Sequence, residues 1–227
     1  VLVARAFNQL YRLRMNTNGE MQAAFRGEQR TPSRCGRLDQ ACAYGVRPVL
    51  MEFDGFEIYS RPLHIGATYY WVVADLKGQK DTVKILADLN KCYPFAETAL
   101  EETVQEALGN DNKGIINQAV KYMEQGDAES LGKLMTQAQQ NFDRKVAPAC
   151  KEELRAPILH SVLEDENIKP WIYGAKGVGS QGDGTVQFLC RDLTSRNELM
   201  RYLEEERGMP SFSLTLKPGQ TVRRAII

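Results

Sequence analysis

The pattern that most limits the fold of this chain is a block of helical segments enclosed by β-rich sequence. Between residues 80 and 170, apolar residues recur three and four positions apart, and Pro or Gly interrupts the pattern at intervals. The helices expected from this periodicity cover residues 83–89, 96–108, 114–125, 128–145 and 151–167. Asp127 directly precedes the fourth of them and is expected to be its N-cap. A block of helices between groups of strands is typical of the α+β class.

Short β-rich segments lie on both sides of the helical block. Before it, residues 48–53 and 56–61 flank the dipeptide Asp54-Gly55, which is typical of a hairpin turn. Tyr69–Asp75 is a nearly continuous apolar run, as expected for a strand covered on both faces. After the block, strands are expected at residues 171–173, 185–191 and 212–216, with a helix at 195–207.

These segments predict two domains, residues 1–79 and 80–217, followed by residues 218–227 as a linker or the start of a further domain. Helical spacing begins at the first residue, which is neither Met nor a capping residue, and a second short helix is expected at residues 20–29. We therefore interpret the chain as a fragment that begins inside a helix.

The charge balance excludes a class of partners. Lys and Arg together number 29, and Asp and Glu also number 29, so the formal net charge is zero. A protein that coats nucleic acid or an anionic membrane needs a surplus of Lys and Arg, because neutralising phosphate supplies most of its affinity. No apolar run approaches the roughly 20 residues that span a bilayer. We expect neither a nucleic acid nor a membrane as partner.

The cysteines and histidines predict no metal or disulfide framework. The five cysteines are widely spaced and form no C-x-x-C pair, so a reducing cytoplasm is the expected compartment. Two histidines, His64 and His160, are too few for a His-rich metal site and are expected to be structural.

The first candidate site is residues 174–184, which concentrate glycine between two expected strands. Glycine lets a backbone adopt positive φ and approach a ligand closely. The candidate residues are Gly174, Gly177, Gly179, Ser180, Gly182 and Gly184. The segment is not a Walker loop, because it lacks the G-x-x-x-x-G-K-[ST] pattern. A ligand-binding loop and a mobile hairpin loop both fit this composition.

The second candidate site surrounds Asp39. This residue follows Gly36 in a loop that also contains Arg30, Arg34 and Arg37. A carboxylate near cationic side chains stays ionised and can accept the proton of a substrate hydroxyl. An Asp where a loop enters a helix is also a common N-cap, so both interpretations stay open at this point.

Together these segments resemble the GHMP kinases, the family of galactokinase, homoserine kinase, mevalonate kinase and phosphomevalonate kinase. Residues 34–40, with Gly36 ahead of Asp39 and Gln40, are similar to the galactokinase segment that carries a catalytic aspartate. Residues 174–189 resemble the third motif of the family, and residues 126–135 resemble its helix with a Gly-Asp turn before Leu-Gly-Lys-Leu-Met. The three segments lie in the family's order, and the resemblance covers about residues 1–203.

The resemblance implies an ATP-dependent sugar kinase of the α+β class. Its N-terminal part would be a truncated relative of ribosomal protein S5 domain 2, and its C-terminal domain would be ferredoxin-like. It implies that Asp39 accepts or orients the proton of the acceptor hydroxyl, that Gly36 lines the acceptor pocket, and that the glycine-rich segment contacts the nucleotide. ATP and Mg²⁺ are the implied cofactors, and phosphoryl transfer needs mainly positioning and electrostatic stabilisation from the protein.

The chain departs from the family pattern in two respects. Gln181 and Asp183 stand where the family usually has glycine, and Asp183 is expected to bring negative charge close to the triphosphate. The family's phosphate-binding loop of Gly, Leu and consecutive serines is absent, so the 227-residue fragment is expected to be inactive alone. Two alternatives stay open: a kinase for a non-sugar alcohol, and a non-catalytic relative that binds a sugar or a nucleotide.

The chain closes with Arg-Arg-Ala-Ile-Ile at residues 223–227. This sequence resembles the first strand of a sugar-phosphate nucleotidyltransferase, although an ordinary tail is the alternative. A fused nucleotidyltransferase would favour a kinase that phosphorylates the anomeric hydroxyl, because the next domain would use the sugar 1-phosphate.

Overall fold

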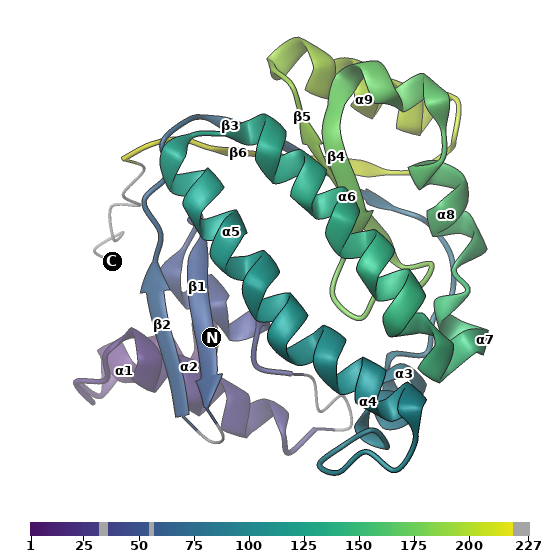
Figure 1. Cartoon of the computed structure of the whole chain (residues 1–227). Helices are drawn as coiled ribbons and strands as arrows, with labels where there is room; N and C mark the ends of the chain where they lie inside the picture. Colours follow the sequence, from purple (N-terminus) through teal and green to yellow (C-terminus); the bar gives the residue numbers. More distant parts are fainter. Residues whose placement is uncertain (32–35, 55–56, 220–227) are drawn as a thin grey trace. The chain divides into compact units, whose positions relative to one another are not determined.

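The computed structural model describes residues 1–31, 36–54 and 57–219 of the chain (Figure 1). It divides into two compact units. The first comprises Val1–His64 with Gly219–Ile227, and the second comprises Ile65–Pro218. Both helices and sheets are present, as expected for the α+β class. Each unit is described by itself below.

The first unit contains two helices, a short 3-10 helix and a hairpin. Its elements are α1 (Leu2–Leu10), α2 (Thr17–Glu28), η1 (Asp39–Tyr44), β1 (Val49–Asp54) and β2 (Glu57–Pro62). The two strands pair antiparallel, with Asp54 opposite Glu57. The predicted hairpin is therefore confirmed, while Gly55 at its turn lies outside the described residues.

The second unit is built on a four-stranded antiparallel sheet. Its strands are β3 (Tyr69–Asp75), β4 (Ile172–Gly177), β5 (Thr185–Cys190) and β6 (Ser211–Leu216), in the order β4-β5-β3-β6. β3 pairs with β5 on one side and with β6 on the other. The unit therefore begins before β3, whereas the sequence predicted a boundary after residue 79. The difference arises because β3 pairs with strands more than a hundred residues later, and local patterns do not report such pairing.

The helices of the second unit follow the predicted block, except near Gly109 and Ala156. They are α3 (Thr82–Asn90), α4 (Ala99–Glu106), the π-helix η2 (Ala107–Asp111), α5 (Asn112–Gln125), α6 (Ala128–Lys145), η3 (Ala147–Cys150), α7 (Lys151–Leu154), α8 (Pro157–Leu163), η4 (Glu166–Trp171) and α9 (Leu193–Glu205). The bounds of α6 are as predicted, and Asp127 caps it by accepting a hydrogen bond of 2.9 Å from the Ser130 amide.

The predicted break at Gly109 is wrong, because a π-helical turn carries the chain from α4 into α5 without interruption. The predicted single helix at residues 151–167 is also wrong. The helix divides at Ala156, which directly precedes Pro157 and has a left-handed φ of 42°. A residue before proline is disfavoured in the right-handed helical region, which explains the division. The expected strand at 171–173 extends instead to Gly177.

Apolar clusters cover both faces of this sheet. On one face, Val72 of β3 and Phe188 of β5 pack with residues of α8 and α9. On the other, Tyr69 and Leu189 pack with α6, and residues of α5 lie against this cluster. Tyr69 is only 1% exposed. The prediction that Tyr69–Asp75 is a strand covered on both faces is therefore confirmed.

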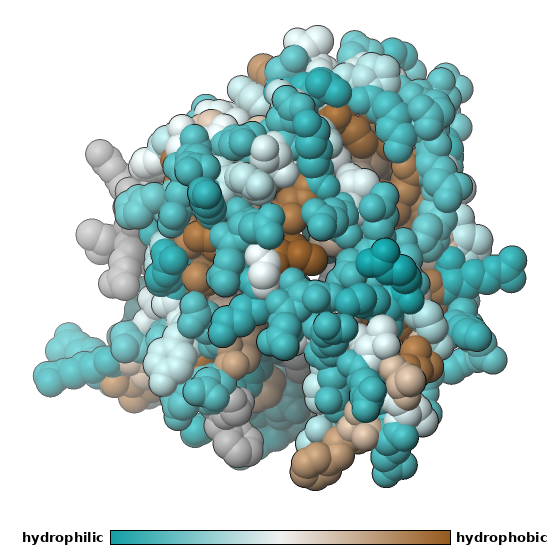
Figure 2. All heavy atoms as spheres, in the orientation of Figure 1, coloured by the Kyte–Doolittle hydropathy of each residue, from teal (hydrophilic) through white to brown (hydrophobic). Residues whose placement is uncertain are grey.

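The surface shown in Figure 2 is mostly hydrophilic, with separate apolar patches between the polar side chains. Among the described residues, no helix combines the length and the apolar composition that crossing a bilayer would require.

Candidate functional site

Asp39 is the first residue of η1, and its side chain is exposed. The N-cap position belongs to Leu38, and no side chain caps this helix. The interpretation of Asp39 as a simple cap is therefore not supported. Gly36, close by in the chain, is also exposed, and a Cβ at this position would meet no atom of the described residues within 4 Å. Packing within the described part of the chain therefore does not require glycine at residue 36.

The rest of η1 is held firmly by its own unit. Gln40 is 4% exposed, and its Nε2 donates to Glu28 Oε2 at 2.7 Å. The Ala43 carbonyl accepts a hydrogen bond of 2.7 Å from the guanidinium of Arg5. These contacts fix the turn that begins with Asp39 and leave its carboxylate at the surface. The arrangement can present a fixed carboxylate to a substrate hydroxyl.

Arg37, two residues before Asp39, contacts an aromatic ring of its own unit. The Arg37 guanidinium lies 4.5 Å from the centre of the Phe25 ring. Arg37 and Phe25 line a cavity of about 540 Å³ together with Gln22, Arg26 and Glu57. Arg34 lies outside the described residues. Of the two described arginines of this loop, Arg37 therefore lines a cavity of the first unit, and Arg30 is exposed.

The glycine-rich segment lies in the second unit, where β4 takes up its first part. A Cβ at Gly174 would lie 1.8 Å from the carbonyl oxygen of Gly132, which belongs to α6. Glycine at this position is therefore required for the close approach of α6 to β4. Gly182 and Gly184 lie against the Lys80 side chain, where an added Cβ would be 3.3 Å and 2.7 Å from its nearest atoms. These glycines serve the packing of the loop.

Gln181 and Asp183 turn into the protein. They are 5% and 9% exposed, and Asp183 Oδ1 accepts a hydrogen bond of 2.8 Å from the Leu159 amide in the first turn of α8. The backbone carbonyl of Gln181 accepts a hydrogen bond of 2.9 Å from Lys80 Nζ, and burial lowers the pKa of that lysine. The carboxylate of Asp183 is therefore bonded within the protein, and its expected approach to the triphosphate stays a prediction. Left-handed φ angles of 64° at Gln181 and 72° at Gly182 turn the chain so that Asp183 points inward.

The tip of the loop is formed by Gly179 and Ser180. Gly179 is exposed, has a φ of 61°, and a Cβ there would meet nothing within 4 Å. The amides of Val178 and Gln181 are hydrogen-bonded to other residues of the loop region. Within the described part of the chain, the amides of Gly179 and Ser180 have no hydrogen-bond acceptor. Adjacent backbone amides in such a turn bind the oxygens of anions, so the residues present fit a nucleotide phosphate.

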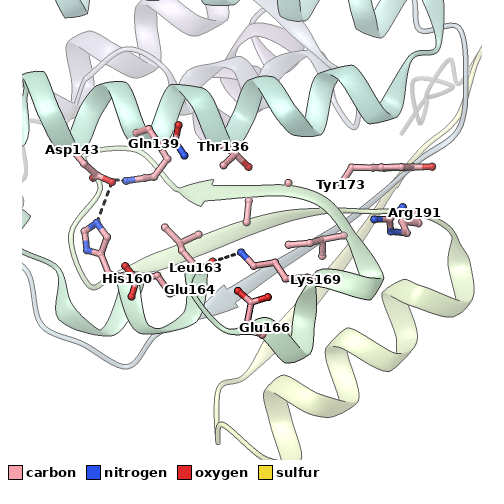
Figure 3. Close-up of a pocket in the computed structure, with 14 residues that line it drawn as sticks. Thr136, Gln139, Asp143, His160, Leu163, Glu164, Glu166, Lys169, Tyr173 and Arg191 are labelled. Atoms are coloured by element: carbon pink, nitrogen blue, oxygen red, sulfur yellow. Dashed lines mark hydrogen bonds and ion pairs between the residues drawn. The ribbon is translucent and has the colours of Figure 1, made fainter.

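A cavity of the second unit was not expected from the sequence (Figure 3). Its volume is about 550 Å³, and residues of α6, α8, η4 and β4 line it. Asp143 and His160 face each other at one end, joined at 3.1 Å, and the Arg191 guanidinium lies 5.1 Å from the Tyr173 ring centre at the other. Gln139 lies beside Asp143 and donates to its Oδ1 at 2.8 Å. The i, i+4 spacing of Gln139 and Asp143 was the one signal in the sequence.

The surroundings of His160 favour its charged form. Its Nδ1 lies 2.9 Å from the Ala156 carbonyl oxygen, while its Nε2 lies 3.1 Å from Asp143 Oδ2. Both partners can only accept hydrogen bonds, so the imidazole satisfies both when it carries two protons. Partial burial lowers its pKa, but the hydrogen bonds to Asp143 and Ala156 outweigh that effect and hold the pKa above its usual 6.5. The expectation of a structural role for His160 agrees with these contacts.

Comparison with solved structures gives clear matches. Mevalonate kinase of L. major, solved with R-mevalonate, is 21% identical with a TM-score of 0.70, and the match covers 95% of this chain and 63% of that one. Galactokinase of Lactococcus lactis, solved with galactose, is 16% identical with a TM-score of 0.67, over 96% of this chain and 63% of that one. Phosphomevalonate kinase of Streptococcus pneumoniae, in complex with phosphomevalonate and AMPPNP, is 14% identical with a TM-score of 0.71, over 93% and 65%.

Sequence comparison, by contrast, finds no relative. No protein-family model matches the chain, and no curated protein sequence matches it. The chain spans about 63% of the length of the mevalonate kinase and the galactokinase. At these identities the likeness establishes the architecture, which mevalonate kinase, galactokinase, phosphomevalonate kinase and homoserine kinase share. The chain has the fold of the GHMP kinases, as the resemblance of its motifs predicted.

Proposed function

We propose that this chain is the larger, C-terminal part of an ATP-dependent kinase that transfers the γ-phosphoryl group to a sugar hydroxyl. The observation that carries the proposal is its fold, shared over almost its whole length with kinases of small alcohols. The finer description of that fold, an incomplete S5-like part before a ferredoxin-like domain, belongs to the same proposal. The sugar is inferred from Asp39 and Gln40, whose segment resembles that of galactokinases.

Each candidate residue has a role in this proposal. Asp39 accepts or orients the proton of the acceptor hydroxyl, and Gly36 lines the acceptor pocket beside it. The amides of Gly179 and Ser180 hold phosphate oxygens of the nucleotide, whose Mg²⁺ supplies charge neutralisation when bound. The remaining glycines of the loop, namely Gly174, Gly177, Gly182 and Gly184, shape its backbone. The proposed compartment is the cytoplasm.

The proposal includes a further polypeptide segment that completes the enzyme. Every residue of α1 is at least partly exposed, and its apolar side chains Leu2, Val3 and Leu10 are 81%, 72% and 74% exposed. An amphipathic helix of this kind needs a partner for its apolar face. The matched kinases are longer than this chain. We infer that the 227 residues alone do not phosphorylate a substrate, because the partner segment would also supply the phosphate-binding loop.

The test uses the chain together with the polypeptide encoded ahead of it. Release of ADP is measured with Mg·ATP and a panel of monosaccharides, and Asp39→Asn is the matched variant. A sugar kinase gives sugar-dependent turnover that falls about 10²–10⁴-fold in Asp39→Asn, which is the usual contribution of a general base. Binding of a sugar without turnover in either protein would instead identify the non-catalytic relative. The inward orientation of Gln181 and Asp183 supports the catalytic alternative, because neither side chain obstructs the tip of the loop.

The second candidate function is phosphorylation of a non-sugar alcohol. It is favoured by the match to mevalonate kinase, whose identity of 21% is higher than the 16% of galactokinase. Including mevalonate and homoserine in the substrate panel separates the two candidates directly. A fused nucleotidyltransferase after residue 227 also stays a proposal, since residues 223–227 lie outside the described part of the chain. Formation of a sugar 1-phosphate, detected by ³¹P NMR, would support it.

A further inference from the structure

The strand that leads into the glycine-rich loop lies at the edge of its sheet. β4 pairs with β5 alone, so the backbone groups along its other side need partners from outside the sheet. At Gly177, the last residue of β4, the amide donates a hydrogen bond of 2.8 Å to Oε1 of Gln139. Gln139 is 4% exposed and projects from α6. A buried side chain thus replaces a neighbouring strand at the point where the loop begins.

The orientation of the Gln139 amide is fixed by a chain of hydrogen bonds (Figure 3). Its Nε2 donates to Asp143 Oδ1 at 2.8 Å, and Asp143 Oδ2 faces His160 Nε2 at 3.1 Å. His160 in turn is held by the Ala156 carbonyl at the start of α8. Since a carboxylate can only accept, the nitrogen of the Gln139 amide must point toward Asp143 and its oxygen toward Gly177. These hydrogen bonds therefore present an acceptor, Gln139 Oε1, to the amide of Gly177, which is the first anchor of the loop.

The second anchor of the loop leads to the same helix. Asp183, near the other end, accepts the amide hydrogen of Leu159, and Leu159 is the neighbour of His160 on α8. Both ends of residues 177–183 are thus connected to α8, one through Gln139 and Asp143 and one directly. A loop fixed at both ends has few conformations left for its tip. The amides of Gly179 and Ser180, which have no acceptor among the described residues, lie between the two anchors.

We propose that Gln139 is a positioning residue for the nucleotide: it fixes Gly177 and so holds the amides of Gly179 and Ser180 ready for phosphate. This rests on the proposed function for the nucleotide itself. Gln139 is not expected to touch the ligand, because its two polar atoms are engaged by Gly177 and Asp143. Loss of Gln139 therefore loosens the loop, and the binding of nucleotide weakens as a consequence.

The first measurement is amide hydrogen exchange in the 227-residue chain. Gln139→Met removes the acceptor with little change of volume, and Gln137→Met is the matched control, since Gln137 is exposed on the same helix. We expect exchange at Gly177 to become at least about tenfold faster in Gln139→Met and to stay unchanged in the control. Protection of the buried Phe188 amide in β5 reports that the sheet is intact. Equal exchange at Gly177 in Gln139→Met and wild type, with the sheet intact, overturns the proposal.

A paired variant separates positioning from general damage to the core. Gln139→Glu keeps an acceptor for the Gly177 amide but places the new carboxylate against that of Asp143. Combining Gln139→Glu with Asp143→Asn restores a hydrogen bond between the two positions, with the donor now at residue 143 and the acceptor at residue 139. We expect slow exchange at Gly177 to be lost in the single variant and recovered in the double one. Failure of the double variant to recover it, with the sheet intact, would show that the hydrogen bonds do not hold the loop.

The role toward nucleotide is measured by titrating Mg·AMPPNP into the longer polypeptide used for the kinase assay. We expect the Kd to rise about tenfold in Gln139→Met and to return to within about threefold of wild type in the double variant. An unchanged Kd despite faster exchange overturns the positioning role. If the wild-type protein binds no nucleotide, the kinase proposal fails along with that role, and the exchange comparison still decides whether Gln139 anchors Gly177.

Discussion

The close approach of α6 to β4 predicts opposite effects for the same substitution at two helical glycines. Gly132 lies within α6, and a Cβ there would be 2.3 Å from the Tyr173 Cβ and 2.8 Å from the Gly174 nitrogen of β4. Ordinary contact begins near 3.4 Å, so Gly132→Ala forces the helix and the strand apart by about 1 Å. Gly114 in α5 has no atom within 4 Å of the corresponding position. Gly114→Ala is therefore the matched control.

The magnitudes follow from two terms. Overpacking of a well-packed site costs about 1–3 kcal/mol, and we expect the upper end because the opposing atoms belong to the backbone or are directly attached to it. Replacing a helical glycine by alanine returns up to about 1 kcal/mol. Gly132→Ala should therefore lower the free energy of unfolding by about 2 kcal/mol, while Gly114→Ala should raise it by about 0.5–1 kcal/mol.

The assay is equilibrium unfolding in urea followed by tryptophan fluorescence. The chain has two tryptophans, Trp71 and Trp171, and both lie in the second unit, so the signal reports the unit that contains the substituted glycines. Equal m-values would show that the same surface is exposed on unfolding in each variant. A Gly132→Ala protein at least as stable as the wild type, with an unchanged m-value, would refute the close contact between α6 and β4.

Three further predictions concern side chains of the two units. Asp183→Ala leaves the Leu159 amide buried without an acceptor and should lower the free energy of unfolding by about 1–3 kcal/mol in the same assay, whereas Asp183→Asn, which retains an acceptor oxygen, should lose less. Because the pKa of His160 is raised in the folded state, its stabilising contribution is complete below the usual pKa of 6.5 and is lost as pH rises through the folded-state pKa. The urea midpoint of the wild type should therefore fall toward that of His160→Gln as pH is raised from acidic to alkaline. A difference between the two midpoints that stays constant with pH would contradict this prediction. In a Cys35→Ser background, Cys42 is exposed and should react with a thiol reagent in the native protein, while the buried thiols should react only after unfolding. The buried thiols are those of Cys92, Cys150 and Cys190.

Local sequence patterns predicted the helices and strands whose boundaries are set by residues at or next to their ends. The helix α6 was predicted at its observed bounds because Gly126, with a φ of 79°, ends the preceding helix and Asp127 caps the next one. The strand Tyr69–Asp75 was predicted because an unbroken apolar run needs cover on both faces. In each case the residues that set the boundary are adjacent to it.

Features that depend on distant residues were not predictable in this way. The membership of β3 in the second unit is decided by its pairing with β5 and β6, which the sequence of β3 does not encode. Gln139 on α6 is a polar residue of a type usually found on the solvent-facing side of a helix. It is a buried acceptor because β4 lies against it. Buried polar groups of this kind satisfy a partner from elsewhere in the chain, so local composition carries little trace of them.

The candidate site likewise combines features that the sequence predicted with features that depend on distant residues. The family resemblance directed attention to Asp39, and the structure places it at the exposed start of a fixed turn. The glycines of the loop were all predicted to bind the cofactor, but Gly174 is explained by the approach of α6. A motif identifies which positions must be glycine, and it does not distinguish the two reasons for glycine, which are close packing and access to a ligand.

Gln181 and Asp183, which stand where the family usually has glycine, leave the tip of the loop uncovered, as the proposed nucleotide site requires. Pointing outward, they would have covered the tip and placed a carboxylate beside the proposed position of the phosphates. Both are instead buried, and Asp183 is bonded to α8. The departure from the family pattern thus changes how the loop is supported, while the part left accessible between Val178 and Gln181 consists of the small residues Gly179 and Ser180. Nucleotide affinity should therefore depend more strongly on the buried supports of the loop than on any exposed side chain within it.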